Sequence, residues 1–262
     1  MLLKDKRILI LGIANHRSIA AGIARACHEQ GATLCLTYLN DKMKKGVEKV
    51  ARDLGEPLLL PCDVTNDEQV ADLFNHLKEA WGEIDGLVHS LAFADQTDLR
   101  GSFAETSRDG FLLAQNISAF SLVHLSKHAL PLMKEGSSVI CMSYLGGERV
   151  VENYNVMGVA KASLEMSAKY LAATLGPDGV RVNIVSPGPI KTLAASGIGG
   201  FRSILDSVKA VNPLRRNVTP EDVGGTAVYL LSDLSRAVTG ETIHVDAGYH
   251  VIGMMSADKP EG

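Results

Sequence analysis

The feature that most constrains this chain is the repeated alternation of short apolar runs with longer helix-like segments. The apolar runs are nearly continuous in Val, Ile and Leu, where a half-exposed strand would alternate with polar residues. They cover residues 7–13, 32–38, 57–62, 84–90, 137–143, 180–186 and 241–247. Strands that helices cover on both faces have this composition. The alternation therefore predicts an α/β fold, a doubly wound parallel sheet of about seven strands with helices on both faces.

Several of the helical segments carry recognisable end signals. The segment RSIAAGIARACHEQG stops at Gly31, and NDEQVADLFNHLKEAWG begins with an Asn cap and stops at Gly82. The segment TPEDVGGTAVYLLSDLS has Thr219 as its cap and Pro220 in its first turn. A further helix is expected from about residue 153 to residue 175. Capping residues at the start and glycine at the end are the usual boundaries of helices.

Nothing in the sequence divides the chain. We find no linker, repeat, low-complexity segment or change of composition, so residues 1–262 are predicted to form a single Rossmann-like domain with a frayed polar tail at 256–262. The one long interval without a clear strand or helix signal is 186–217, which follows the C-terminal end of a strand. Ligands bind at that edge of open α/β sheets, so a substrate-binding loop is expected at about residues 190–212.

The composition limits the possible partners and compartments. Hydrophobic residues make up 46% of the chain and its net charge is −4, which favours an ample core and disfavours a broad grip on nucleic acid or on an anionic membrane. The N-terminal apolar run is too short for a signal peptide, and no run approaches the ~20 residues that span a bilayer. The four cysteines have no CxxC or metal-like spacing and are expected to be reduced thiols. A cytoplasmic protein is predicted.

The connection after the first apolar run has some properties of a dinucleotide-binding turn. The strict GxGxxG pattern is absent, because only Gly12 and Gly22 are glycine in LGIANHRSIAAGIA. A turn at Gly12, followed by small residues such as Ala14 and Ser18 at the start of a helix, still lets the backbone approach a pyrophosphate near positive helix-end amides. An ordinary strand–turn–helix connection remains an alternative for this stretch.

Two later strand ends favour the dinucleotide interpretation. The third strand ends in a carboxylate, Asp63, which can meet an adenine amino group or can simply cap the next helix. The fourth ends in the small and apolar residues of VHSLAFA, at 88–94, which suit a backbone close to a ribose. After the second strand, neither Leu39 nor Asn40 is basic, so no charge is placed there to pair with a 2′-phosphate. The cofactor is therefore predicted to be NADH, and NADPH is less favoured.

Two tyrosines and a lysine form the strongest chemical signal. Tyr144 directly follows the strand VICMS, while Tyr154 and Lys161 are seven residues apart and are expected on one face of a helix. The lysine can reach a ribose hydroxyl, and its charge would favour an ionised or strongly hydrogen-bonding Tyr154. Such a phenol can donate to an oxygen that gains negative charge. Considered singly, Tyr154 would be interpreted as a tyrosine at a helix entry and Lys161 as a solvated surface lysine.

These residues carry a resemblance to a known family. The stretch SYLGGERVVENYNVMGVAKASLE, followed by RVNIVSPGPIKTLAASGI, resembles the bacterial enoyl-acyl-carrier-protein reductases of the short-chain dehydrogenase/reductase superfamily. The spacing Tyr144-x9-Tyr154-x6-Lys161 is typical of them, whereas other members of the superfamily have Tyr-x3-Lys. The resemblance extends over essentially the whole chain, although Leu39, the segment DQTD after Ala94, and Pro187 depart from the family's usual residues.

The resemblance implies an activity and the residues for it. It implies reduction of trans-2-enoyl thioesters in type II fatty acid synthesis, with hydride from NADH delivered to C3. Tyr154 would hold the enolate oxygen, Lys161 the nicotinamide ribose, and Tyr144 would act near the substrate. The implied cofactor contacts are Gly12, Ala14, Ser18, Ile19, Leu39, Asp63, Val64, Ser90, Leu91, Ala92, Lys161, Ile190, Thr192, Leu193 and Ala194. The implied acyl pocket comprises Ala94, Met157, Ile198 and Phe201.

The resemblance also implies binding partners, and two alternative functions remain to be weighed against it. Acyl carrier protein would deliver the substrate, with basic residues in and after the 190–212 loop as a possible docking face, and the chain would form a homotetramer. No metal site is expected, since His124 and His128 have no third ligand nearby. A short-chain ketoreductase or hydroxyacyl dehydrogenase is the nearest rival, but its Tyr-x3-Lys would need lysine at Gly158. A non-catalytic dinucleotide-binding scaffold is the rival from another class.

Overall fold

A single parallel sheet of seven strands, in the order β3-β2-β1-β4-β5-β6-β7, organises the protein. The computed structural model describes residues 1–192 and 201–253, without the side chains of 201 and 202. Every predicted strand is present. The strands are β1 Arg7–Leu11, β2 Thr33–Tyr38, β3 Leu58–Pro61, β4 Ile84–His89, β5 Met133–Met142, β6 Arg181–Pro187 and β7 Thr242–Val245.

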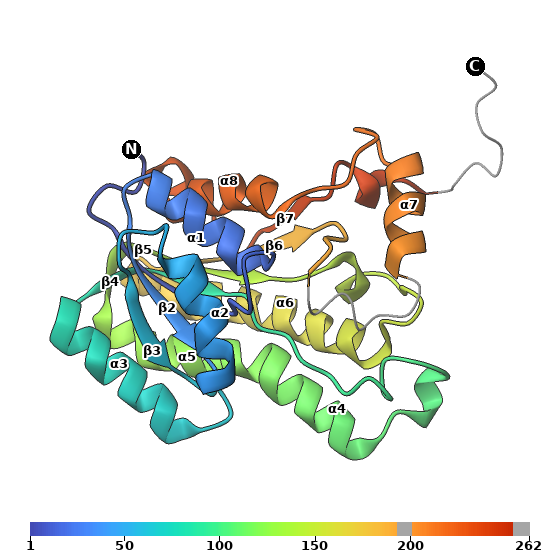
Figure 1. Cartoon of the computed structure of the whole chain (residues 1–262), viewed down its shortest axis with the longest axis horizontal. Coiled ribbons are helices and arrows are strands. Elements are labelled where there is room, and N and C mark those ends of the chain that lie inside the picture. Colours follow the sequence, from blue (N-terminus) through green and yellow to red (C-terminus); the bar gives the residue numbers. More distant parts are fainter. Residues whose placement is uncertain (193–200, 254–262) are drawn as a thin grey trace.

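Helices cover the sheet on both faces, as predicted. Figure 1 shows α1 and α8 on one side of the sheet and α3, α5 and α6 on the other. The α-helices are α1 Ile19–Glu29, α2 Asp41–Ala51, α3 Asp67–Trp81, α4 Arg108–Gln115, α5 Ser121–Ala129, α6 Asn155–Leu175, α7 Phe201–Val211 and α8 Pro220–Leu231. A π-helical turn, Asn116–Phe120, joins α4 to α5, and a 3-10 turn, η4 Leu145–Gly147, follows β5.

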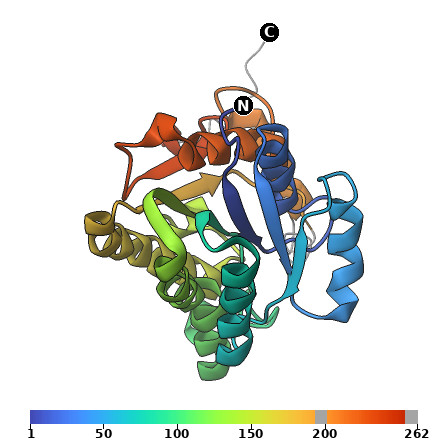
Figure 2. The same ribbon diagram turned by 90° about the vertical axis from the view of Figure 1, so that its left-hand side faces the viewer.

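The sheet separates two hydrophobic cores, which explains why its strands are continuously apolar. In β1, Ile8 and Ile10 pack under α1, α2 and α8, whereas Leu9 and Leu11 pack under α3, α5 and α6. All four side chains are fully buried. Successive residues of a strand point to opposite faces, so a strand with helices on both sides has no face toward water and is mostly apolar. The end-on view in Figure 2 shows these two helical layers around the twisted sheet.

The helix boundaries that the sequence predicted are confirmed by their caps. The Asn66 side chain accepts hydrogen bonds from the amides of Glu68 and Gln69 at 3.0 and 3.1 Å, and Gly82 ends α3 with φ of 75°. Thr219 and Asp222 form a reciprocal capping box at the start of α8. These side chains satisfy amides that the first helical turn leaves without partners.

The structure differs from the prediction in the interval 186–217, where no clear helix signal is present in the sequence. The helix α7 occupies residues 201–211. Its apolar positions recur at helical spacing, and Val208 is 3% exposed. The flanking segments GIGG and NPLRRN made the whole interval resemble a loop. Residues 193–200 and the predicted frayed tail lie outside the described residues.

The four cysteines lie in the interior of the protein. All four cysteines are buried free thiols, and burial raises the pKa of each to about 12. Such thiols are inert. In the described ranges, no helix is both long enough and apolar enough to cross a bilayer, and α6 itself carries Lys161, Glu165 and Lys169.

Helices α1 and α8 approach each other closely through glycines. A Cβ atom added to Gly22 would lie 2.5 Å from the Cβ of Pro220, and one added to Gly224 would lie 2.8 Å from the Cβ of Ala26. Both distances are shorter than real Cβ contacts. Next along α8, Gly225 is exposed, and nothing would lie within 4 Å of its Cβ.

These two neighbouring glycines provide a test of helix packing against helix propensity. Both Gly224→Ala and Gly225→Ala gain helix propensity of about 0.5–1 kcal/mol. We expect Gly225→Ala to raise the free energy of unfolding by that amount. Gly224→Ala should lower it by about 1–3 kcal/mol, because overpacking outweighs the gain. Urea unfolding of both variants measures the difference, and equal stabilisation by the two would contradict the packing described.

Candidate active site

The carboxyl ends of adjacent strands bring the predicted site segments to one edge of the sheet. In the register, Leu11 of β1 lies opposite His89 of β4, His89 lies opposite Cys141 of β5, and Cys141 lies opposite Ile184 of β6. The segments that begin after these strands therefore start side by side. The order β3-β2-β1-β4 also reverses direction between β1 and β4, which is where open α/β sheets bind nucleotides.

The turn after β1 fits a closely approaching dinucleotide. Gly12 has φ of +101°, and a Cβ added there would lie 2.0 Å from the carbonyl oxygen of Ser90. No other residue type fits at this position. Ser18 Oγ accepts from the amides of Ala14 and Asn15 at 3.3 Å, which fixes the turn, and α1 begins at the next residue. The N-terminal amides of α1 therefore point toward this edge, where they suit a pyrophosphate.

Gly22 lies in the first turn of α1, where it is buried against Pro220 of α8. One alternative for Asp63 is wrong. Asp63 does not cap α3, because the cap is Asn66. The Asp63 carboxylate instead accepts from the amide and the hydroxyl of Thr65, at 2.9 and 2.7 Å. A cofactor role for Asp63 remains a prediction.

The two tyrosines meet at the end of β5. Tyr144 follows the strand and Tyr154 precedes α6, and their rings are 5.0 Å apart between centroids, at 70°. This is the favoured edge-to-face arrangement of aromatic rings. A Cβ added to Gly146 would lie 2.4 Å from Cδ1 of Tyr154 and 3.2 Å from Cδ1 of Tyr144. Gly146 is thus required by the pair. Gly146 was not predicted as a site residue, although a Gly-Gly pair shortly after a strand end could have indicated it.

Tyr154 is placed by a bend in the chain, which differs from the predicted position on a helical face. It is the residue before α6, and its neighbours Asn153 and Asn155 have φ of +59° and +30°. Asparagine tolerates these left-handed conformations better than most residues. The Asn155 side-chain amide also donates to the carbonyl oxygen of Gly101 at 3.2 Å. The two asparagines therefore set the direction of the tyrosine.

Lys161 is a buried lysine, with 4% of its surface exposed. Its Nζ donates to the carbonyl oxygens of Met142 at 2.7 Å and Leu91 at 3.4 Å. Among the described residues these are its hydrogen-bond partners, so one of its three N–H groups is left for a bound molecule. Burial lowers the pKa of Lys161 to about 8, while Cys141 and Glu165 act in the opposite direction.

Of the two expected forms of Tyr154, the ionised phenol is wrong, and the strongly hydrogen-bonding phenol stays a prediction. Burial raises the pKa of Tyr154 far above its usual range, and Tyr144 and Glu165 add to this rise. Lys161 does not offset it, because its ammonium faces the two backbone carbonyls. Burial also raises the pKa of Tyr144 to about 12, with a smaller effect from Tyr249. Both phenols therefore stay protonated at neutral pH and act as hydrogen-bond donors.

An apolar cluster lies beside Tyr154. It joins Ala114, Val156, Met157 and Ala160 with the partly buried Ala94, Leu99, Phe111 and Tyr154. The structure thus brings the expected pocket residues Ala94 and Met157 next to the tyrosine. Leu193, Ala194 and Ile198 lie outside the described residues, as does the side chain of Phe201, whose backbone begins α7.

The remaining expected cofactor contacts follow the carboxyl ends of their strands. Leu39, after β2, is 52% exposed, and Val64 follows β3. Ser90 and Ala92 follow β4 on either side of Leu91, whose carbonyl binds Lys161. After β6, Ile190 is buried and accepts a hydrogen bond from the amide of Thr192 at 2.8 Å. Their common edge is consistent with the expectation, and their individual contacts stay predictions.

His89, His124 and His128 contact other side chains. His89 is fully buried, with Nε2 2.7 Å from Ser121 Oγ, and burial lowers its pKa to about 3, so it is neutral. The rings of His124 and His128 have centroids 4.9 Å apart. Within residues 1–192 and 201–253, no group of three or more potential ligands is arranged to hold a metal ion.

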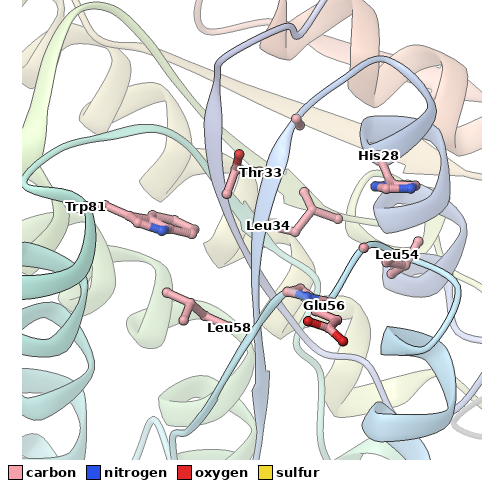
Figure 3. A pocket seen from close by; sticks show the side chains of 10 residues that line it. His28, Thr33, Leu34, Leu54, Glu56, Leu58 and Trp81 are labelled. Carbon is pink, nitrogen blue, oxygen red and sulfur yellow. The ribbon is translucent and has the colours of Figure 1, made fainter.

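A hollow at the opposite edge of the sheet is separate from this site. Figure 3 shows it at the amino ends of β2 and β3, where Trp81, His28 and Glu56 surround Leu34 and other apolar side chains. Its volume is about 320 Å³. Because parallel strands present their carboxyl ends at the other edge, this hollow cannot contribute to the Tyr154–Lys161 site.

Comparison with known proteins agrees with this geometry. A family model described as enoyl-(acyl carrier protein) reductase matches residues 12–250. The enoyl-[acyl-carrier-protein] reductase [NADH] FabI of Bacillus cereus is 56% identical over 254 residues, which cover 96% of this chain and 99% of the relative. The enzyme of Staphylococcus aureus strain MRSA252, named for NADPH, is 53% identical over 252 residues, 95% of this chain and 98% of the relative.

Solved structures give the same result. The Bacillus cereus enoyl-acyl carrier protein reductase, in complex with NADP+ and indole naphthyridinone, is 55% identical, with a TM-score of 0.95 over 97% of this chain and 99% of that one. The NADH enzyme of Aquifex aeolicus is 46% identical, with a TM-score of 0.95 over 97% and 100% of the two chains. The family match and these full-length similarities establish that the chain belongs to the enoyl-(acyl carrier protein) reductase family.

Proposed function

We propose that this protein reduces trans-2-enoyl thioesters, carried by acyl carrier protein, to saturated acyl thioesters in type II fatty acid synthesis. The observation that carries the proposal is the buried Lys161 beside the Tyr144–Tyr154 pair at the carboxyl edge of the sheet. Relatives with the same full-length match are named for this reaction. The proposal covers one reductase domain with its substrate loop between about residues 190 and 212.

The residues of the chain have distinct tasks in this reaction. When bound, NADH would supply a hydride to C3 of the enoyl group, and one proton taken up from solution would complete the saturated acyl group at C2. As C3 gains the hydride, negative charge would develop on the thioester oxygen. Tyr154 remains protonated and donates a hydrogen bond to that oxygen, in a site lined by Ala94 and Met157. A preorganised donor in a dry site stabilises the charge more in the transition state than in the ground state. Tyr144 packs on the Tyr154 ring and limits its movement.

Lys161 would bind the cofactor and contribute its charge. The carbonyl oxygens of Met142 and Leu91 fix its Nζ, so that the remaining N–H can donate to a ribose hydroxyl. Its positive charge also stabilises the negative charge that develops nearby during the reaction. Neutral Lys161 would lose both functions.

The end of β2 supports NADH as the cofactor. Asn40 uses its side chain to cap α2, accepting from the amide of Met43 at 3.1 Å, and Leu39 is apolar. The Lys44 ammonium lies 5.5 Å from the centroid of the Tyr38 ring. None of these is placed as a dedicated partner for a 2′-phosphate, which would then bind with an uncompensated charge.

Two surfaces support the proposed partners. Exposed basic residues such as Lys191, after β6, and Lys209, in α7, can receive the acidic acyl carrier protein, whereas Arg216 is paired with Asp222 at 2.7 Å. On the far side of the sheet, Met166 and Tyr170 of α6 are 53% and 72% exposed beside an apolar hollow between α5 and α6. Such a face supports association into the proposed homotetramer.

The proposal is tested by substrate choice. Purified protein with crotonyl thioester should oxidise NADH with a higher kcat/KM than NADPH, followed by absorbance of the reduced nicotinamide. Acetoacetyl thioester serves as the control substrate and should give no oxidation. Turnover with acetoacetyl thioester alone would favour the ketoreductase, and cofactor binding without any turnover would favour a scaffold.

Removing the phenol oxygen of Tyr154 should affect chemistry and spare binding. We expect Tyr154→Phe to lower kcat by about 100- to 1000-fold, because one donor to the developing charge is lost. NADH affinity should change little. Tyr229→Phe, which alters a partly buried tyrosine of α8 on the opposite face of the sheet, is the matched control and should keep wild-type kcat. Equal kcat for Tyr154→Phe and wild type would contradict the role of the phenol.

The pH dependence should report Lys161. Because kcat/KM reflects groups of the free enzyme, and Lys161 has a pKa of about 8, activity should be full below this pH and fall by about tenfold per pH unit above it. The phenols titrate at higher pH and do not account for this fall, the alkaline limb of the pH profile. Steady-state rates between about pH 6 and pH 10 measure it. A limb near pH 10 would mean that Lys161 keeps an ordinary pKa.

A further inference from the structure

Glu165 is a buried acid that the proposed mechanism does not use. It lies one turn after Lys161 on α6 and is 7% exposed. Its Oε1 accepts a hydrogen bond from the hydroxyl of Ser143, the last residue before Tyr144. Acids are rarely buried without a partner or a function. Glu165 therefore lies between Lys161 on α6 and the segment after β5 that carries Tyr144.

The charges around Glu165 are mixed. Burial raises its pKa, and so does Glu148, while the Ser143 hydroxyl, Lys169 and His244 lower it. Glu148 has its own partner, since its Oε1 lies 2.8 Å from Nε2 of His244 on β7. Glu165 is therefore not stabilised by a direct ion pair among the described residues; its fixed partner is the serine hydroxyl.

Among the titratable groups around Lys161, the Glu165 carboxyl is the one that can carry a negative charge. Cys141 on β5 and Tyr154 keep their protons, and buried His89 on β4 is uncharged. In the described part of the chain, no carboxylate lies within ion-pair distance of Nζ, whose partners are backbone carbonyls. Cys141 could favour the charged form of Lys161 only as a thiolate, and its raised pKa keeps it neutral, so the Glu165 carboxyl, one helical turn away, is the group that can do so through space.

We propose that Glu165 is a positioning residue of the reductase, whose carboxylate keeps Lys161 charged while its bond to Ser143 fixes the segment that carries Tyr144. This inference rests on the proposed function, because it is measured through turnover. An acid in direct contact with Lys161 would occupy the N–H that the ribose needs. One turn away, held by a serine, it provides a favourable potential in a poorly solvated region without competing for that N–H.

The test is the alkaline limb of kcat/KM for Glu165→Gln. Glutamine can still bond to Ser143 and fill the space, but the negative charge is gone. Lys161 should then lose its proton at lower pH, and the limb should move down by roughly one pH unit. Glu152→Gln, which removes an exposed carboxylate two residues before Tyr154, is the matched control and should leave the limb in place. A merely structural role would lower activity at every pH without moving the limb.

A second variant covers the case in which Glu165→Gln does not fold. Ser143→Ala removes the hydroxyl that favours ionised Glu165, so the limb should move in the same direction by a smaller amount. Thermal unfolding and NADH binding verify that each variant is folded. If the wild-type enzyme is active and Glu165→Gln has its alkaline limb at the same pH as wild type, the assignment is overturned. If only Ser143→Ala folds, an unchanged limb in that variant has the same consequence. Inactive wild-type enzyme on crotonyl thioester would instead refute the proposed function.

Discussion

The burial of one ammonium group at the carboxyl edge of the sheet is the constraint on which the site depends. Removing Lys161 from water is costly, and the carbonyl oxygens of Met142 and Leu91 offset part of that cost. Those carbonyls come from the ends of β5 and β4, which can converge on one nitrogen only because the two strands are parallel neighbours in register. The helix α6 then holds the lysine against this edge. The hydrogen bonds of the Lys161 amine therefore depend on the order of the strands, on where the strands end and on the placement of α6.

The same burial acts in opposite ways on the phenols and the amine. For Tyr144 and Tyr154, burial opposes the charged form, so the hydroxyls remain donors. For Lys161, burial opposes the charged form that the site needs, so this residue alone requires compensation. The compensation comes from carbonyl dipoles and from a carboxylate that does not touch it. This difference separates the residue that donates a hydrogen bond from the one that supplies charge.

What could be predicted from the sequence follows from how local each determinant is. The strands and the caps at Asn66 and Thr219 were predictable, because apolar composition and capping side chains act within a few residues. The bend around Tyr154 was not, since it depends on left-handed Asn153 and Asn155 and on contact with a distant loop. The sign of the Tyr154 pKa change was also not predictable. Helical spacing indicates which residues are near, but not that the lysine turns toward backbone carbonyls.

The residues expected to select the cofactor and the residues expected to carry the chemistry lie at different strand ends. Lys161 and the tyrosines lie at the ends of β4 and β5 and beside α6, whereas Leu39 lies at the end of β2, on the other side of β1. Residues at the end of β2 can therefore change without disturbing the hydrogen bonds of Lys161. Overall similarity thus identifies the reaction, while relatives of nearly equal overall identity are named for NADH in one case and NADPH in another.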